Sequence, residues 1–227
     1  MIAAIIVAAG KGLRMAGPLR KQYLELEGLP ILAHTLTVFD ACDLIDGIFL
    51  VLPQEDIDYC RAKVLDPLSL TKSIRLVSGG IRRQDSVYAG LNEIDQRYGI
   101  IVIHDGVRPF LTSDHLVDCI KSAQKFGACI LGIPAYDTLK RVDSSDRILD
   151  TLPRENVWLA QTPQAFHYDV IKRAHENARR DGYAATDDAS LVERMGEKVK
   201  IINGSRNNIK ITRPEDFDIA KYLLRIS

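Results

Sequence analysis

The segment from residue 8 to residue 21 combines backbone freedom with positive charge. Gly10 and Gly12 would let backbone N–H groups approach a bound anion closely. Four cations lie within eleven residues of this segment: Lys11, Arg14, Arg20 and Lys21. A triphosphate would use all of these features, whereas an exposed basic loop without a ligand is the alternative. The segment is not a P-loop, and Met15 stands where a dinucleotide fingerprint needs its third glycine.

A second candidate segment again joins paired glycines to polar side chains, in the sequence GGIRRQDSV from residue 79 to residue 87. The glycine pair permits tight backbone contact with a ligand, and Ser86 could form a hydrogen bond to it. The alternative is a plain turn in which Asp85 offsets the dipole at the start of a helix.

Three later segments carry further chemistry. Asp105 leaves a hydrophobic stretch, which suits a carboxylate that holds Mg²⁺ and a ribose hydroxyl, although Asp-Gly is also a common turn. We expect His104 to be packed rather than catalytic. The run Thr186-Asp187-Asp188 is most simply a helix N-cap with acids in the first turn. Lys210, in an extended stretch, is either a catalytic cation or an exposed lysine.

The elements that must position these segments alternate along the chain. Short apolar runs rich in Val and Ile indicate strands at Ile2–Ala8, Ile48–Leu52, Ser73–Val77, Ile100–His104, Cys129–Pro134 and Val199–Asn203. Helical spacing appears at Pro30–Ala41, Glu55–Leu65, Gln84–Ile94, Ser113–Lys125, Tyr168–Arg179 and Glu215–Leu224. This alternation predicts an α/β fold with a doubly wound, mainly parallel sheet in a single domain, 1–227. In such folds ligands bind beyond the carboxyl ends of the strands, where the candidate segments lie.

The stretch 136–158 departs from this alternation. It is polar and holds the turn-like sequence Asp143-Ser144-Ser145-Asp146 between the short segments Leu139–Val142 and Ile148–Leu152. We therefore expect a protruding β-hairpin arm. Because an isolated hairpin is only marginally stable in water, the arm should pack against a second copy of the chain and form a homodimer.

Composition excludes several classes of protein. The 227 residues carry 30 basic and 30 acidic side chains, so no global field attracts nucleic acid or an anionic membrane. The longest apolar run, residues 2–9, is too short to cross a bilayer and lacks the flanks of a signal peptide, which predicts a cytoplasmic protein. The four cysteines have no C-x-x-C spacing, and we expect buried free thiols.

Taken in order, the motifs of this chain resemble those of one family. They are AAGKGLRM (8–15), KQYL (21–24), GGIRRQDSV (79–87), HDGVRPF (104–110), DTLKRV (137–142), QTPQAF (161–166), TDDAS (186–190) and NIKITRPED (208–216). The family is 2-C-methyl-D-erythritol 4-phosphate cytidylyltransferase. The resemblance implies transfer of CMP from CTP to methylerythritol phosphate with release of pyrophosphate, in the non-mevalonate route to isoprenoid precursors, with Mg²⁺ as cofactor.

The resemblance also implies roles for individual residues. The reacting phosphates would be surrounded by Arg14, Lys21 and Lys210. The nucleotide would be held by Ala8, Ala9, Gly10, Gly12, Gly80, Ser86, Asp105 and Gly106, and Asp105 would also serve the metal. The second substrate would be bound by Arg108, Thr162 and Thr186, with Thr138 and Arg154 reaching it from the partner subunit's arm.

Two other functions are weighed against this one. Ribitol 5-phosphate cytidylyltransferase shares the CTP motifs, but Lys140 and Arg141 favour the methylerythritol enzyme. A sensor that binds CTP without turnover is of another class, and it would have little need of the full set of cations and Asp105.

The sequence departs from the family at Arg20, where a proline often precedes the lysine of KQYL, which affects the expected path of residues 16–20.

Overall fold

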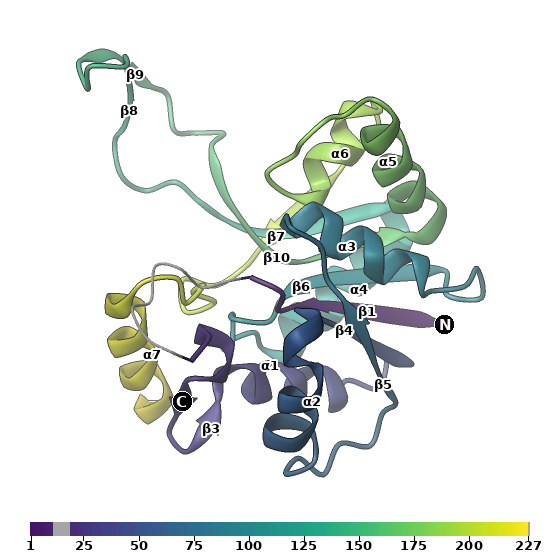
Figure 1. Cartoon of the computed structure of the whole chain (residues 1–227). Helices are drawn as coiled ribbons and strands as arrows, with labels where there is room; N and C mark the ends of the chain where they lie inside the picture. Colours follow the sequence, from purple (N-terminus) through teal and green to yellow (C-terminus); the bar gives the residue numbers. More distant parts are fainter. Residues whose placement is uncertain (11–18, 227) are drawn as a thin grey trace.

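The computed structural model describes residues 1–10 and 19–226, and its centre is a seven-stranded sheet in the order β11-β7-β10-β6-β1-β4-β5 (Figure 1). The strands are β1 (Ile2–Val7), β4 (Gly47–Leu52), β5 (Ile74–Ser78), β6 (Ile100–Asp105), β7 (Ala128–Pro134), β10 (Trp158–His167) and β11 (Lys200–Asn203). All neighbouring pairs are parallel except those that β10 makes with β6 and β7. The predicted doubly wound, mainly parallel sheet is therefore confirmed.

The sequence did not indicate β10, which lies in the middle of the sheet. Its residues Gln161, Thr162 and Gln164 are polar, and Pro163 has no N–H to donate to a neighbouring strand. The pairing of β10 with β7 shifts register between Ala160 and Gln164, so the strand accommodates the proline at an irregularity. Polar residues in a central strand are unusual, and here they point to the site described below.

Helices flank the sheet on both faces. They are α1 (Ile31–Asp40), α2 (Ile57–Cys60), α3 (Arg83–Asn92), α4 (Ser113–Phe126), α5 (Tyr168–Arg180), α6 (Asp188–Arg194) and α7 (Pro214–Ile226). Shorter elements are the 3₁₀ turns η1 (Lys21–Tyr23) and η2 (Gln54–Asp56), the π turn η3 (Arg61–Leu65), and the small pair β2 (Glu25–Leu26) and β3 (Leu29–Pro30). The single helix expected over residues 55–65 is instead the irregular sequence η2, α2 and η3.

Two apolar cores explain why β1 is hydrophobic along its whole length. Ala4 and Ile6 pack into the core that α1, α2 and α4 cover. Ile5 and Val7, which point to the other face, pack into the core beneath α3, α5 and α6. Burial on both faces is typical of parallel sheets, and it leaves the ends of the strands as the place for polar chemistry.

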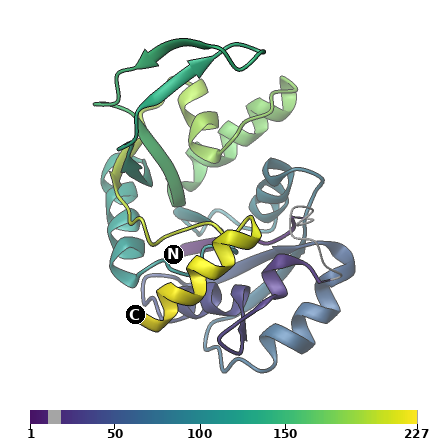
Figure 2. The same ribbon diagram turned by 90° about the vertical axis from the view of Figure 1, so that its left-hand side faces the viewer.

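The arm is a separate two-stranded antiparallel hairpin, β8 (Leu139–Val142) and β9 (Ile148–Leu152), with the bounds that the sequence indicated. Figures 1 and 2 both show it extending away from the body of the molecule. Asp143 shapes its tip by accepting hydrogen bonds from the backbone N–H groups of Ser145 and Arg147. The apolar side chains of Ile148 and Leu149 are 63% and 60% exposed, so the arm of the single chain has hydrophobic surface that no other part of the described chain covers.

Two further features concern the cysteines and the length of the helices. All four cysteines are free and buried, as expected. No helix in the described ranges, 1–10 and 19–226, has the length and apolar character needed to span a membrane.

Candidate active site

The candidate site lies at the point where the sheet changes winding direction. From β1 the chain continues to β4 and β5 on one side, and then crosses back to β6 on the other side of β1. In doubly wound sheets ligands bind in the crevice at such a point, beyond the carboxyl ends of the strands. Val7 pairs with Asp105 at these ends, which brings the segments after β1 and β6 together.

The first cavity opens above these strand ends. Predicted nucleotide and phosphate residues that line it are Ala8, Ala9, Gly10, Lys21, Gly80, Ser86, Asp105 and Lys210. Gly106 is not among its lining residues: its N–H donates to the Val7 carbonyl at 2.9 Å, and a Cβ there would lie 3.1 Å from that of Ala8. Gly106 thus lets the two strand ends approach each other. The predicted residues Gly12 and Arg14 lie outside the described residues.

The second cavity adjoins the first. It is lined by Arg108, Ala160, Gln161, Thr162, Gln164, Thr186 and Asp187, together with three residues that also line the first cavity. These shared residues are Arg83, Asp105 and Lys210. The second-substrate residues predicted within one chain, Arg108, Thr162 and Thr186, all belong to the second cavity. A charged wall of two cations and one carboxylate therefore forms the border between two polar cavities.

Asp105 is the centre of this wall. Its Oδ1 lies 2.9 Å from Arg83 Nε, and its Oδ2 lies 2.9 Å from Lys210 Nζ and 3.5 Å from Arg108 Nε. Burial alone would raise the pKa of this carboxyl, but the charges of Arg83, Lys210 and Arg108 outweigh burial and hold the pKa below its ordinary value. Asp105 is ionised, and its immediate surroundings still carry net positive charge.

Lys21 reaches the segment that carries Lys210, although 190 positions separate Lys21 from its hydrogen-bond partner Ile211. The Lys21 ammonium donates to the Ile211 carbonyl at 3.0 Å, next in sequence to Lys210. The same extended segment accepts a hydrogen bond from Arg108 at the Asn208 carbonyl, at 2.7 Å. The stretch from Asn208 to Ile211 therefore accepts hydrogen bonds from cations of two distant parts of the chain, and its own Lys210 lines both cavities.

His104 has a structural role, as expected. Its Nε2 lies 3.2 Å from the Arg108 carbonyl, which can only accept, so Nε2 carries the proton and Nδ1 accepts from the Thr162 hydroxyl at 3.0 Å. The Thr162 oxygen in turn accepts from the Asp105 N–H at 3.1 Å. Burial lowers the pKa of His104 to about 3, so the ring is neutral. This network fixes Asp105 in the border and Thr162 in the wall of the second cavity.

The segment 79–87 forms the turn and helix start that the alternative interpretation predicts, and it also borders the first cavity. Asp85 accepts from the Arg82 backbone N–H at 3.2 Å and caps the start of α3. Ser86 Oγ accepts from the Gly80 N–H at 3.1 Å, which tightens the turn, and Ser86 also lines the first cavity. A Cβ on Gly79 would lie only 2.4 Å from that of Ala9, so glycine is needed for the two loops to pack together.

The N-cap predicted at residues 186–188 is confirmed. Asp187 Oδ1 accepts from the Ser190 N–H at 3.0 Å at the start of α6. Gln164, from β10, supports the same turn by accepting from the Asp188 and Ala189 N–H groups at 3.2 and 3.1 Å. This contact holds α6 and Thr186 at the edge of the second cavity.

The arm residues stay apart from both cavities. Thr138 and Arg154 are exposed and line neither cavity within the described part of the chain. Arg154 donates to the Tyr136 carbonyl at the base of the arm. Any contribution of these two residues to a site must therefore come from another arrangement of chains.

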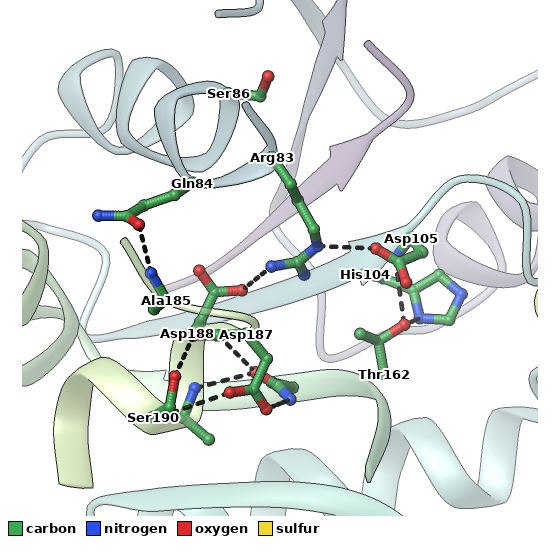
Figure 3. A network of polar contacts seen from close by, with 12 residues as sticks. Arg83, Gln84, Ser86, His104, Asp105, Thr162, Ala185, Asp187, Asp188 and Ser190 are labelled. Atoms are coloured by element: carbon green, nitrogen blue, oxygen red, sulfur yellow. Dashed lines mark hydrogen bonds and ion pairs between the residues drawn. The ribbon is translucent and has the colours of Figure 1, made fainter. Parts of the chain in front are cut away.

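Arg83 is a site residue that the sequence did not indicate. It bridges Asp105 and Asp188, with Nε 2.9 Å from the first carboxylate and one terminal nitrogen 2.7 Å from the second (Figure 3). The sequence signal for a cation at this position was the adjacent pair Arg82 and Arg83, which follows Gly80. Only the fold distinguishes them, because Arg82 pairs with Asp85 at the surface while Arg83 points inward.

No three His, Cys, Asp or Glu side chains within residues 1–10 and 19–226 are grouped so that they could hold a metal ion. The one carboxylate common to both cavities is Asp105. Mg²⁺ is commonly held by one or two carboxylates together with substrate phosphates and water. The donor set therefore fits Mg²⁺ only in company with a phosphate ligand.

Comparison with known proteins shows the family of this chain. The family model for 2-C-methyl-D-erythritol 4-phosphate cytidylyltransferase matches residues 2–226. Relatives with that name from Geotalea uraniireducens (strain Rf4) and Geobacter metallireducens are 45% and 46% identical over 226 residues, and the matches cover 99% and 98% of this chain and 97% of each relative. The crystal structure of 4-diphosphocytidyl-2C-methyl-D-erythritol synthase from Anaerococcus prevotii superposes with a TM-score of 0.88 at 34% identity, covering 99% of this chain and 96% of that one. The chain is a nucleotidyltransferase and belongs to the 2-C-methyl-D-erythritol 4-phosphate cytidylyltransferase family.

Proposed function

We propose that this enzyme transfers CMP from CTP to 2-C-methyl-D-erythritol 4-phosphate and releases pyrophosphate. The observation that carries the proposal is the pair of adjoining cavities that share Arg83, Asp105 and Lys210. CTP would occupy the first cavity, with its base against the backbone of Ala8, Ala9 and Gly10. The acceptor would occupy the second cavity, so that its phosphate meets the α-phosphate of CTP at the border.

The reaction needs no general base. A phosphate monoester has a second pKa near 6, so the acceptor is already mainly a dianion at neutral pH. One of its oxygens attacks the α-phosphorus, a new P–O bond forms, and the bond to the β-phosphate oxygen breaks with its electron pair on pyrophosphate. This is consistent with the neutral, buried His104, which has both ring nitrogens engaged.

The difficulty of the step is electrostatic, because two anions must meet and negative charge develops on the leaving group. Lys21 and Lys210 would stabilise the reacting phosphates of CTP, with Arg14 added from the cation-rich segment. Arg108, Thr162 and Thr186 would bind the acceptor. Asp105 would fix the positions of Lys210 and Arg83 and would accept a hydrogen bond from a ribose hydroxyl.

We propose Mg²⁺ as the cofactor, held by Asp105 together with the phosphates of CTP. Both Asp105 oxygens already face cations, so the ion would be favoured only once the triphosphate adds its negative charge. When bound, it would neutralise charge on the phosphates and on the leaving pyrophosphate.

We propose that the enzyme is a homodimer in which the arm of each subunit reaches the acceptor in the other. The exposed Ile148 and Leu149 supply apolar surface that a partner would cover, since solvent-exposed apolar side chains of this size gain free energy on burial. Thr138 and Arg154 would then serve the partner's second cavity. Four free buried thiols and balanced charge support a cytoplasmic enzyme without affinity for nucleic acid or membranes.

The acceptor is the finer part of the proposal. Lys140 and Arg141, which favoured methylerythritol phosphate over ribitol 5-phosphate, pair across the hairpin with Thr151 and Asp150, so their contribution would be to the shape of the arm. The test is incubation with CTP, Mg²⁺ and either acceptor, with the cytidylylated product identified by mass spectrometry. Product from methylerythritol phosphate at a kcat/KM at least tenfold above that from ribitol 5-phosphate supports the proposal, and the reverse preference overturns it.

A further inference from the structure

A buried pair of ionisable side chains lies behind the border of the two cavities. His175, on α5, and Asp188, the first residue of α6, have exposed fractions of 0% and 1%. The ring Nε2 lies 3.0 Å from Asp188 Oδ1. The other ring nitrogen, Nδ1, has no hydrogen-bond partner among the described residues. This pair takes no part in the mechanism above, yet burying a carboxylate is costly unless it is paired.

Asp188 connects His175 to Arg83. While Oδ1 faces the ring, Oδ2 lies 2.7 Å from a terminal nitrogen of Arg83 (Figure 3). Burial would raise the pKa of Asp188, but Arg83 and His175 lower it, so the carboxylate is charged. Because the carboxylate is charged and has a partner on each side, its contacts with His175 and Arg83 form together only when its plane is turned toward both. The ring thus fixes the carboxylate, and the carboxylate fixes the guanidinium.

The position of the ring is itself defined from α3, the helix that begins with Arg83. Tyr88 stacks on His175 with ring centroids 6.3 Å apart and planes at 20°. The guanidinium of Arg179, also on α5, lies over the Tyr88 ring, 4.3 Å from its centroid. The same helix therefore carries both Arg83 and the side chain that packs against His175, which makes the triangle of α3, α5 and α6 rigid at this point.

Arg83 has one donor nitrogen without a partner among the described residues. Its Nε and one terminal nitrogen bind Asp105 and Asp188, whereas the other terminal nitrogen is buried without a hydrogen-bond partner in the described chain. Arg83 lines both cavities. Because the guanidinium is planar, holding two of its nitrogens fixes the direction of the third. That direction matters only if an anion arrives at the border.

We propose that His175 is a positioning residue that acts through Asp188 to aim the remaining Arg83 donor at a phosphate oxygen in the border between the cavities. The inference rests on the proposed function, since it takes phosphates as the ligands of that border. His175 itself touches no substrate. It contributes by keeping Asp188 from turning away from Arg83.

The test compares His175→Leu with His175→Gln. Leucine keeps the apolar volume but offers no donor to Asp188, whereas the glutamine amide nitrogen can take the place of Nε2. We expect kcat/KM to fall about tenfold in His175→Leu, the range expected for second-layer partners of an active-site group. We expect His175→Gln to stay within about threefold of wild type by the same reasoning. Ile171→Val, on the same helix, is the matched control for a small loss of packing in this core.

A cycle with Arg83→Ala separates positioning from structural support. Once Arg83 is absent, His175→Leu should lower kcat/KM no further, because the two substitutions act through one group. Equal losses in the two His175 variants, or additive losses in the cycle, would overturn the proposal, as would wild-type kinetics in a folded His175→Leu. If His175→Leu fails to fold, the comparison of His175→Gln with His175→Asn, whose amide is too short to reach Asp188, replaces it. Wild-type turnover is measured in the same assay, so failure of the proposed reaction is recognised independently.

Discussion

At the scale of single residues, the account depends on cations that the fold gathers around one carboxylate. Lys21 and Lys210 come from opposite ends of the chain and meet at the segment Asn208–Ile211. We predict that Lys21→Ala or Lys210→Ala lowers kcat/KM by about 10²–10⁴, or about 3–5 kcal/mol, because each removes charge that stabilises the transition state. Steady-state assays check this, with Lys121→Ala, an exposed lysine of α4, as the control. Turnover within threefold of wild type in either folded variant would refute the role.

His104 provides a pH-dependent prediction. Its pKa is about 3 in the folded state against an ordinary value of 6.5 for histidine, so below pH 6.5 the unfolded chain binds a proton that the native protein does not. Stability must therefore fall as the pH is lowered through this window. Between pH 7.5 and pH 5 the wild type should lose roughly 2 kcal/mol more unfolding free energy than His104→Gln, whose amide can still donate to the Arg108 carbonyl. Urea denaturation at the two pH values measures this difference. Parallel losses in both proteins would contradict it.

Single residues were predictable from the sequence where a motif carried them and not where only the fold joins them. Asp105 and Lys210 stood out by type and by resemblance, and the structure brings them within 2.9 Å. Arg83 was missed because nothing in the sequence says which of two adjacent arginines turns inward. The long-range contact between Arg83 and Asp188 spans 105 positions, and local patterns contain no information on it.

At the scale of elements, the two glycine segments must pack against each other for the first cavity to exist. A Cβ at Gly79 would lie 2.4 Å from that of Ala9 and 2.9 Å from Ser86 Oγ. We predict that Gly79→Ala destabilises the protein by about 1–3 kcal/mol, as overpacking does, and weakens CTP binding measured by calorimetry. Gly99→Ala is the matched control, because a Cβ there meets nothing within 4 Å. Equal effects of the two substitutions would show that the contact between the loops is unimportant.

The elements also show how far hydrophobic patterns reach. The buried strands β1, β4 and β6 were evident because both faces are apolar, and the hairpin was evident because its turn residues interrupt two short β-prone runs. β10 was not recognised because three of its six buried residues, Gln161, Thr162 and Gln164, are polar. Two of them form contacts at the site: Thr162 bonds Asp105 and His104, and Gln164 supports α6. Polar residues that serve the site thus stand where the apolar residues of a central strand would normally reveal it in the sequence.

At the scale of the whole molecule, the arm predicts that each active site needs two chains. We expect co-expressed dimers of a Lys21→Ala chain with an Arg154→Ala chain, purified through two different tags, to show about half of the wild-type activity, since one of the two sites is intact. Each variant alone should be nearly inactive. Sedimentation of the wild type checks the dimer itself, and a monomer at micromolar concentration would rule out the arrangement.

The reciprocal pairing provides the control. A chain carrying both Lys21→Ala and Arg154→Ala, paired with a wild-type chain, should be nearly inactive if the arm serves the partner. If the arm instead serves its own subunit, that dimer retains half of the activity and the first pairing retains almost none. The active and the inactive pairing are therefore opposite in the two arrangements. Incomplete folding of one variant would lower activity in both pairings and cannot imitate the predicted result.

The most direct measurement of the central claim is pyrophosphate release by the wild-type enzyme with Mg²⁺ and methylerythritol phosphate, with CTP compared against ATP, GTP and UTP, and with the acceptor omitted. The account predicts fast release that requires both CTP and the acceptor, because the two cavities must both be filled for the phosphates to meet at Arg83, Asp105 and Lys210. CTP binding without release in the presence of the acceptor would contradict it and would indicate a sensor of CTP instead.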